Sequence, residues 1–123
     1  MVTSENRSFI IEALTDASGT ATHNDIRTHV CNIYINYTQG SEDAILMKFK
    51  IYEASLDRWA YLTYFYHGSV EYLTTRLTKT MNSVISLAIP KGVERFQIEY
   101  EFEGDTSNVG NLNLEYRDDD STM

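Results

Sequence analysis

Apolar and polar residues alternate with a period of two in several stretches of this chain, and this alternation constrains the fold more than any other feature of the sequence. Between residues 93 and 103, every second position is aromatic or aliphatic, namely Phe96, Ile98, Tyr100 and Phe102. Successive side chains of a β-strand point to opposite faces, so this pattern predicts a strand with one buried face. The same alternation predicts strands over residues 28–37, 44–52, 83–89 and 111–117.

Turn-forming residues separate the predicted strands at intervals of about 8–12 residues, which is the spacing of an all-β sandwich or barrel. Gly40 and Gly68 can adopt the positive φ angles that tight turns require. Pro90 ends the strand before it, because proline has no N–H to donate to a neighbouring strand. We expect residues 16–22, which are small and polar, and residues 104–110 to be loops.

Three further segments bring the expected number of strands to eight. Residues 8–14 fit either a short helix or a strand, and residues 58–66 fit a strand. Residues 70–80 have apolar residues at helical spacing, but threonines crowd the segment and favour a strand. Eight strands in two sheets is the number in a jelly roll or a related Greek-key sandwich. We therefore expect one all-β sandwich domain over residues 1–123, with a polar N-terminal segment and an acidic tail at 118–123.

The charge of the chain excludes two classes of partner. The chain has 10 lysine and arginine residues against 18 aspartate and glutamate residues, which gives a net charge of −8. Such a chain lacks the cations that displace counterions from nucleic acid, and anionic membrane surfaces repel it. We therefore expect neither nucleic acid nor a membrane as a partner.

The sequence also indicates the compartment. Cys31 is the single cysteine, so no disulfide forms within the chain and nothing indicates an oxidising compartment. The N-terminus lacks the basic and apolar regions of a signal peptide, and no apolar run approaches the roughly 20 residues that cross a bilayer. We expect synthesis in a cytoplasm without export by the standard route.

Residues 59–66 are the densest aromatic segment of the chain. Alternation divides its large side chains between two faces. One face carries Trp59, Tyr61 and Phe65, and the other carries Leu62, Tyr64 and Tyr66. A strand that is apolar on both faces is either central in a sandwich or covered by another chain. The segment is therefore core, a set of interface anchors, or a sugar-stacking platform. The candidate interface residues are Trp59, Tyr61, Tyr64 and Tyr66.

No spacing in the sequence predicts a catalytic or metal site. The three histidines lack the spacing of a metal motif, and His23, Asp25 and His29 form only a weak candidate group. Cys31 lies on the apolar side of its predicted strand, so we expect a buried, inert thiol. No nucleophile elbow, phosphate-binding loop or dinucleotide fingerprint is present. We expect no enzymatic activity, no cofactor and no bound metal.

Carboxylates gather at two places in the sequence. Glu99, Glu101 and Glu103 are two residues apart and share one strand face, where Lys48 and Lys50 on another strand could relieve their repulsion. The C-terminal tail is either a solvated end or an arm that orders on a basic partner. The acidic residues that we add to the candidate interface are Glu99, Glu101, Asp118, Asp119 and Asp120.

A particular order of strands and turns runs through most of the chain. The turn Tyr-Thr-Gln-Gly-Ser-Glu at 37–42 leads into a long alternating strand, and Leu-Asp-Arg-Trp at 56–59 begins the aromatic one. A proline-marked turn at 89–96 precedes the penultimate strand, and 104–117 supply a closing loop and a short strand. In this pattern residues 28–117 resemble small virion proteins of tailed bacteriophages.

The resemblance implies a non-enzymatic β-sandwich that belongs to the virion. Several such proteins decorate or cement capsids, and others lie in necks, tails or fibres. We therefore expect a head-associated structural protein of the decoration or cement type, with capsid or other virion proteins as partners. Because the aromatic strand needs a cover, we also expect a homo-oligomer, with a trimer as its closed form. The alternatives are a ligand-binding sandwich, such as a carbohydrate-binding or receptor-binding tail or fibre module, and a small β-barrel enzyme.

Overall fold

The computed structural model describes residues 6–14, 17–24, 26 and 30–119, with the backbone alone at 6–14 and 118–119. This described part is all β apart from one short 3-10 turn, so the predicted all-β class is confirmed. It contains no helix that is long and apolar enough to cross a membrane. The elements are β1 (Asn6–Leu14), β2 (Ser18–His23), β3 (Val30–Thr38), β4 (Glu42–Glu53), the 3-10 turn (Ala54–Leu56), β5 (Arg58–Tyr61), β6 (Thr63–Tyr66), β7 (Ser69–Tyr72), β8 (Thr74–Leu77), β9 (Met81–Ala88), β10 (Phe96–Gly104) and β11 (Asn111–Asp119).

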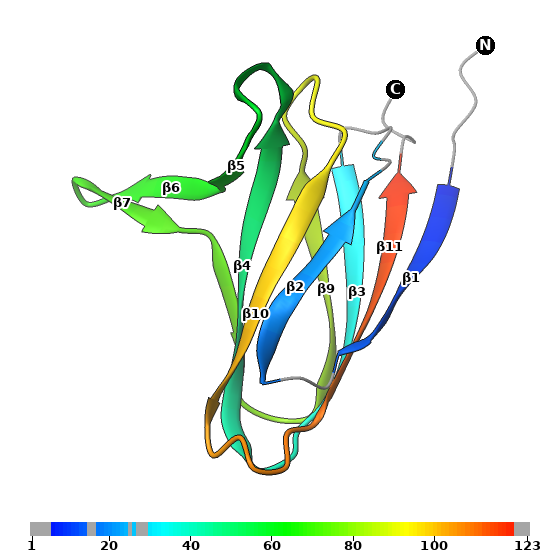
Figure 1. Cartoon of the computed structure of the whole chain (residues 1–123), viewed down its shortest axis with the longest axis vertical. Helices are drawn as coiled ribbons and strands as arrows, with labels where there is room; N and C mark the ends of the chain where they lie inside the picture. The colour runs from blue at the N-terminus through cyan, green and yellow to red at the C-terminus, as the bar shows by residue number, and fades with distance from the viewer. Residues whose placement is uncertain (1–5, 15–16, 25, 27–29, 120–123) are drawn as a thin grey trace.

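Two antiparallel sheets pack face to face, and a small hairpin projects from one side of them (Figure 1). One sheet has the order β1-β11-β3-β9, and the other has the order β2-β10-β4, with β5 and β8 both paired to β4. Strands β5 and β8 share one edge position, so the sandwich has eight strand positions. The first strand pairs with the last (β1 with β11), and the pairing continues inward as β2 with β10, β3 with β9 and β4 with β5 and β8. These are the pairings of a long hairpin rolled up on itself. The predicted sandwich is therefore a jelly roll.

The predicted strands 58–66 and 70–80 are wrong as continuous strands. Strand β4 pairs with β5 through residues 50–53 and with β8 through residues 45–48. One edge position of the sheet is thus shared by two short strands, and the chain between them leaves the sheet as the hairpin β6–β7. Alternation within a segment cannot predict where the chain leaves the sheet, because that point depends on which residues of β4 pair with β5 and which pair with β8.

The first two strands settle one alternative and correct one expectation. Residues 8–14 belong to strand β1, so they are not helical. The loop predicted at 16–22 is wrong over β2, whose residues are small or polar and carry no clear alternation. Strand β2 forms because it pairs with β10 along its whole length, with Gly19 opposite Tyr100. A Cβ added at Gly19 would lie 2.9 Å from the Tyr100 hydroxyl, so the absent side chain leaves room for the tyrosine ring.

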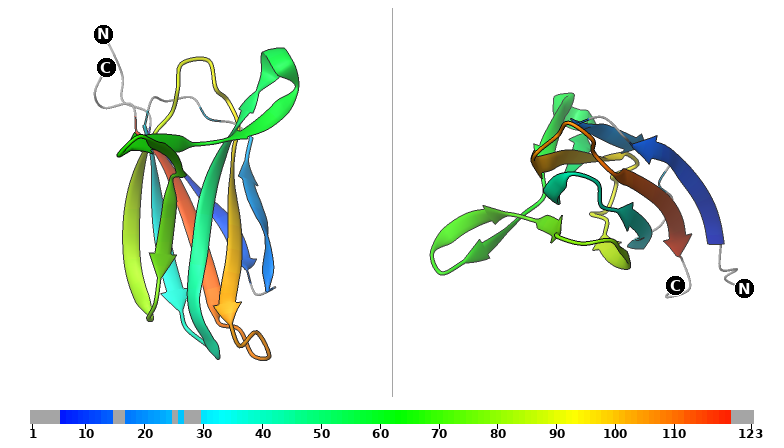
Figure 2. Two further views of the ribbon diagram at one scale, coloured as in Figure 1. Left: turned by 90° about the vertical axis from the view of Figure 1, so that its left-hand side faces the viewer. Right: turned by 90° about the horizontal axis from the view of Figure 1, so that it is seen from below.

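The core lies between the inner faces of the two sheets (Figure 2). Phe96 and Tyr116 come from opposite sheets, are both 0% exposed, and hold their ring centroids 4.8 Å apart. Cys31, on β3 in the same sheet as Tyr116, is fully buried, as its position on the apolar side predicts. The alternating residues of the predicted strands therefore do form the core.

A buried carboxylate closes one end of the sandwich, where the loops after β3 and β10 meet (Figure 1). Glu42 is 2% exposed; the Tyr37 hydroxyl donates a hydrogen bond to it, as do the N–H groups of Gly40 at 3.0 Å and Gly110 at 2.9 Å. Burial alone raises the pKa of Glu42, but these hydrogen bonds outweigh it and hold the pKa below its usual value. A Cβ at Gly110 would collide with the backbone of Thr38, so this closure requires a glycine.

Candidate functional site

The chain leaves the sheet and returns to it at a single point of β4. Phe49 lies between the β4 residues that pair with β5 and those that pair with β8. Its carbonyl accepts a hydrogen bond from the Leu62 N–H at 2.7 Å, and the Leu62 carbonyl accepts one from the Leu73 N–H at 2.9 Å. Both leucines are half-buried against the core. They anchor a hairpin that projects across the direction of the sandwich strands (Figure 1).

A two-residue turn closes the projecting hairpin. Tyr66 pairs with Ser69, and the two residues between them, His67 and Gly68, have φ angles of 47° and 81°. Positive φ at both positions is the signature of a type I′ turn, whose twist matches that of the flanking strands. The turn expected at this place is therefore present, and it joins two short strands outside the sandwich.

Pairing across the hairpin gives it two different faces. Phe65 pairs with Val70, and these two side chains are 73% and 67% exposed. We call the face that carries them the apolar face; its residues are Thr63, Phe65, Val70 and Tyr72. The opposite face, which we call the tyrosine face, carries Tyr64, Tyr66, Ser69 and Glu71. Both large tyrosines of this second face are also exposed.

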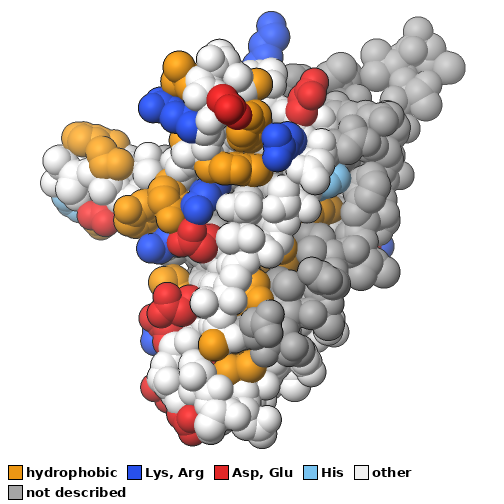
Figure 3. Space-filling model, in the orientation of Figure 1, with side chains coloured by type: hydrophobic (Ala, Val, Ile, Leu, Met, Phe, Trp, Pro, Cys, Tyr) orange, Lys and Arg blue, Asp and Glu red, His pale blue; other side chains and the backbone are white. Residues whose placement is uncertain are grey.

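Two aromatic rings and a lysine hold the base of the hairpin against the sheet. The Tyr61 ring of β5 meets the Tyr72 ring edge to face, with centroids 4.9 Å apart. The Lys48 ammonium lies 4.5 Å from the Tyr72 centroid and 5.9 Å from the Tyr61 centroid. Such cation–π contacts are worth about 0.5–1 kcal/mol at exposed sites. They turn the apolar face toward the outer side of the β2-β10-β4 sheet, where hydrophobic and charged side chains gather (Figure 3).

Basic side chains on neighbouring strands neutralise two of the three β10 carboxylates, and one of them, Lys50, is a residue that the sequence predicts for this role. Glu99 forms an ion pair with Lys50 at 2.6 Å and accepts a hydrogen bond from the Tyr61 hydroxyl at 2.9 Å. The hydrogen bond from Lys50 lowers the pKa of Glu99, and the same bond raises the pKa of Lys50. Glu103 pairs with Arg76 at 2.6 Å. In the described part of the chain, only Glu101 of these three glutamates has no ion pair.

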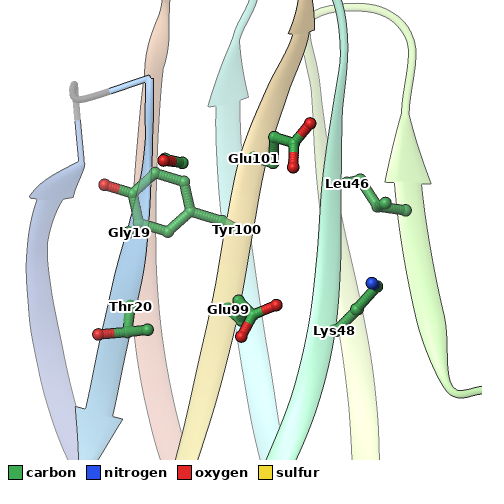
Figure 4. A pocket seen from close by; sticks show the side chains of 8 residues that line it. Gly19, Thr20, Leu46, Lys48, Glu99, Tyr100 and Glu101 are labelled. Atoms are coloured by element: carbon green, nitrogen blue, oxygen red, sulfur yellow. The ribbon is translucent and has the colours of Figure 1, made fainter.

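A shallow hollow of about 310 Å³ lies on the same outer face, beside the base of the hairpin. Figure 4 shows Glu99 and Glu101 of β10 opposite Lys48 and Leu46 of β4, with Thr20 on the far side. Because Lys50 neutralises Glu99, the remaining charges of the hollow are the carboxylate of Glu101 and the ammonium of Lys48. The hollow adjoins the hairpin base, with which it shares Lys48 and Glu99.

The predicted aromatic candidates lie in three separate places. Trp59 is half-buried on the outer face; its ring centroid lies 5.3 Å from that of Tyr52, and the Arg95 guanidinium lies 5.2 Å from it. Tyr61 belongs to the charged cluster at the hairpin base. The other two candidates, Tyr64 and Tyr66, lie on the hairpin itself. These four residues are close in the sequence but do not form one surface in the structure. Only Tyr64 and Tyr66 belong to the exposed hairpin.

The acidic tail begins later than the sequence predicts. The backbones of Asp118 and Asp119 continue β11 and pair with β1 on one side and β3 on the other. Asp120 and the remainder of the predicted tail lie outside the described residues.

The weak metal candidate does not form a described site. His23 is 6% exposed, and its ring stacks on that of Tyr116 with centroids 4.7 Å apart. Asp25 and His29 lie outside the described residues. Within residues that the structure describes, no three potential metal-ligating side chains come together. The expectation that the chain binds no metal stays a prediction.

Sequence reasoning missed half of the exposed hairpin surface. Val70 and Tyr72 were assigned to a strand running to residue 80, and Phe65 was not among the candidate residues. The signal was available, because His67 and Gly68 form a recognisable turn with alternating residues on both sides. Pairing outward from that turn would have placed Phe65 beside Val70.

The outer face of the other sheet carries a row of amides that was also missed. Asn36 of β3 pairs with Asn82 of β9 on one side and with Asn113 of β11 on the other. These three exposed side chains line a hollow of about 520 Å³ together with Tyr34 and Glu115. Each amide offers a donor and an acceptor, which suits a neutral, hydroxyl-bearing ligand.

No family model, no curated protein and no solved structure matches this chain.

Proposed function

We propose that this chain is a non-enzymatic structural protein of a phage virion, of the kind that decorates or cements the head. The observation that carries this proposal is the projecting hairpin, whose two faces expose large apolar and aromatic side chains. Burying one such side chain is worth about 1.5–3 kcal/mol. A hairpin of two strands is marginal in water without further contacts. A protein chain that covers it would therefore gain contact energy and also fix the hairpin.

Two kinds of contact contribute to the proposed attachment. The hairpin joins neighbouring chains by burying apolar area, and such contacts tolerate salt. In this proposal Glu101 and the acidic residues Asp118 to Asp120 bind basic groups of the shell, and salt screens such contacts. A shell presents the same surface many times, so weak contacts act together through avidity.

The assignment to a virion rests on the resemblance of residues 28–117 to phage virion proteins. Jelly rolls occur in capsid proteins and also in lectins, so the fold is compatible with more than one function.

Co-sedimentation with heads of the phage that encodes the chain tests the proposal. We expect the wild type to sediment with heads at moderate salt. Replacing Asp118, Asp119 and Asp120 by asparagine should weaken this binding, and the loss should be greatest at low salt, where Coulomb attraction is strongest. The double change Phe65→Lys and Val70→Lys should reduce the bound amount by about tenfold or more, as loss of interface anchors does.

Leu56→Lys is the matched control for the hairpin change. Leu56 is also exposed, at 57%, but it lies in the 3-10 turn and not on the hairpin. It should bind heads like the wild type. A wild-type chain that never sediments with heads would contradict the proposed function.

The row of amides favours a second candidate function, the binding of a neutral saccharide. Saccharide hydroxyls both donate and accept, as the amides of Asn36, Asn82 and Asn113 do. A glycan array followed by titration separates the two functions, because the head-decoration function predicts no measurable binding to oligosaccharides. Specific micromolar binding that Asn36→Ala abolishes, without attachment to heads, would replace the first function by the second.

A further inference from the structure

Strand β9 is an unprotected edge of the four-stranded sheet. It pairs with β3 on one side, and no described strand pairs with its other side. Edge strands of soluble proteins usually carry charges, prolines or bulges that prevent pairing with another chain. Strand β9 is eight residues long and has no charged residue and no proline. Its outward N–H and C=O groups are therefore open to another strand.

This edge lies on the side of the sandwich from which the hairpin projects. Strand β9 ends one sheet, and β5 with β8 ends the other, so the two edges flank the same open side (Figure 2). On that side the inward residues of β9, Met81, Ser83 and Ile85, are only half-buried. Leu62 and Leu73 at the hairpin base are half-buried there too. The open side therefore combines a free strand edge, incompletely covered core residues and an exposed aromatic hairpin.

The two faces of the hairpin match the two faces of the sheet at β9. The inner face of β9 is mainly apolar and half-covered, and its outer face carries Asn82, Val84 and Ser86. The apolar face of the hairpin, with Phe65 and Val70, can continue the inner face. The tyrosine face, with its hydroxyls and one carboxylate, then continues the outer face.

Charge favours a second copy of this chain as the occupant. Two chains of net charge −8 repel each other unless they meet where charge is absent. Strand β9 carries no charge, and strands β6 and β7 carry only Glu71. A basic partner would instead be attracted to Glu101 on β10, which has no ion pair among the described residues. The hairpin and β9 are therefore surfaces on which two like chains can meet with little repulsion.

We propose that the hairpin of one copy adds to the free edge of β9 in a second copy and extends its four-stranded sheet. This proposal rests on the proposed function only in assigning the hairpin to contacts between chains. The addition gives the hairpin the third strand that it needs in water, and it covers Met81, Ser83 and Ile85 of the receiving copy. Hairpin and edge are different patches, so the contact can repeat from copy to copy, and a ring of three copies is the closed form that we expect.

Sedimentation velocity over a range of concentrations tests the pairing with two matched substitutions. Ser83→Lys places a charge on the inner face of β9, where it would lie under Phe65 and Val70 of the added hairpin. Asn82→Lys places the same charge one residue earlier on the exposed outer face. We expect oligomers for the wild type and for Asn82→Lys, and association at least about tenfold weaker for Ser83→Lys, since burying an unpaired charge is costly.

Disulfide trapping gives a readout that does not depend on the stability of the lysine variant. Chains that carry Val70→Cys are mixed with tagged chains that carry Ser83→Cys, Ile85→Cys or Asn82→Cys. Neighbouring strands place same-face residues within disulfide reach, so we expect mixed dimers with position 83 or 85 and none with position 82. The native Cys31 is fully buried and does not compete.

Three results would overturn the pairing: a wild type that stays monomeric at every concentration, equal association of the two lysine variants, or no mixed dimer at either inner position. The head assay separates these failures from that of the proposed function. A monomer that still sediments with heads keeps the virion function and loses only the hairpin pairing. An oligomer that does not sediment with heads keeps the hairpin pairing and contradicts the virion function.

Discussion

Tyrosines occupy two contrasting regions of this molecule, the sandwich core and the projecting hairpin. Tyr37 and Tyr116 are fully buried between the sheets, whereas Tyr64 and Tyr66 are about half exposed on the hairpin. All four lie in β-strands, Tyr37 in β3, Tyr116 in β11, and Tyr64 and Tyr66 in β6. The difference arises from pairing, because a strand inside the jelly roll has a sheet over its inner face and the hairpin has none. Composition and alternation thus produce strands, and topology decides which of them become core.

The contrast has a consequence for how each region holds together. The core residues are fixed by contacts from both sheets, and the end of the sandwich is fixed by the hydrogen bonds of Glu42. The hairpin is fixed by its type I′ turn, by the two leucines at its base and by the ring contacts of Tyr72. Changes in the core should therefore alter global stability, and changes in the hairpin should alter local order and association.

The largest expected effect distinguishes two phenylalanines. Phe96→Ala removes a ring that is 0% exposed, and Phe65→Ala removes one that is 73% exposed. We expect the first to lower the free energy of unfolding by about 3–5 kcal/mol, as cavity-forming changes do. The second should change it by less than about 0.5 kcal/mol. Denaturant unfolding at low protein concentration, where association does not contribute, measures both; similar losses would end the contrast between the regions.

The next effect concerns the carboxylate at the closed end of the sandwich. Glu42→Gln weakens the hydrogen bonds from Tyr37 and from two backbone N–H groups, and we expect a loss of about 1–3 kcal/mol at neutral pH. The pKa of Glu42 in the folded protein is below its usual value of 4.5. Its contribution is therefore complete above the pKa of the unfolded chain and disappears as pH falls through the folded pKa. The difference between wild type and variant should accordingly shrink in acid.

Glu101→Gln is the matched control for this measurement. Glu101 is exposed and has no ion pair among the residues that the structure describes. Its variant should stay within about 0.5 kcal/mol of the wild type. If the stability difference of the Glu42 variant were independent of pH, the assigned hydrogen bonds would not favour the charged form.

A smaller effect should stay confined to the hairpin. Gly68 has a φ of 81° with open space around its Cα, so Gly68→Ala meets no clash and adds only backbone strain. Left-handed geometry costs a residue with a side chain about 1–2 kcal/mol. Hydrogen exchange of the hairpin amides should accelerate, while the amides of β3, β10 and β11 keep their protection. Equal acceleration in the core would show that the hairpin folds as part of the sandwich.

The smallest effect distinguishes the two buried tyrosines. The Tyr37 hydroxyl donates to Glu42, whereas the buried Tyr116 hydroxyl has no hydrogen-bond partner in the described part of the chain. Removing an unsatisfied buried group is neutral or stabilising. We expect Tyr116→Phe to keep or slightly raise the unfolding midpoint and Tyr37→Phe to lower it. A clear loss in the Tyr116 variant would reveal a partner for that hydroxyl.

Alternation predicted the core strands from the sequence because their inward residues repeat locally. Ile33, Ile35, Phe49 and Ile98 all lie at predicted inward positions and are buried. Strand β2 was missed because its small and polar residues carry no such repeat, and only its pairing with β10 makes it a strand. The burial of Glu42 depends likewise on a distant loop, since Gly110 supplies one of its donors.

The candidate site was predicted only in part, because its shape also depends on pairing between segments that are distant in the sequence. The aromatic density of residues 59–66 was visible, and Tyr64 and Tyr66 are indeed exposed. The break at Leu62 was not visible, because it follows from β4 pairing with β5 and β8 on either side of Phe49. The ion pair between Glu99 and Lys50 agrees with the sequence expectation, whereas the hydrogen bond from Tyr61 to Glu99 depends on how β5 pairs with β4 and was not predictable.

Replacing the hairpin by a short turn tests the central claim, that the sandwich supplies stability and the hairpin supplies association. Leu62 and Leu73 are already joined by a backbone hydrogen bond, so an Asn-Gly type I′ turn can replace the residues from Thr63 to Tyr72. Light scattering then gives the mass of this variant beside that of the wild type, with unfolding curves confirming that both are folded. We expect a folded monomer from the shortened chain and an oligomer from the wild type. A shortened chain that keeps the wild-type mass would contradict this claim.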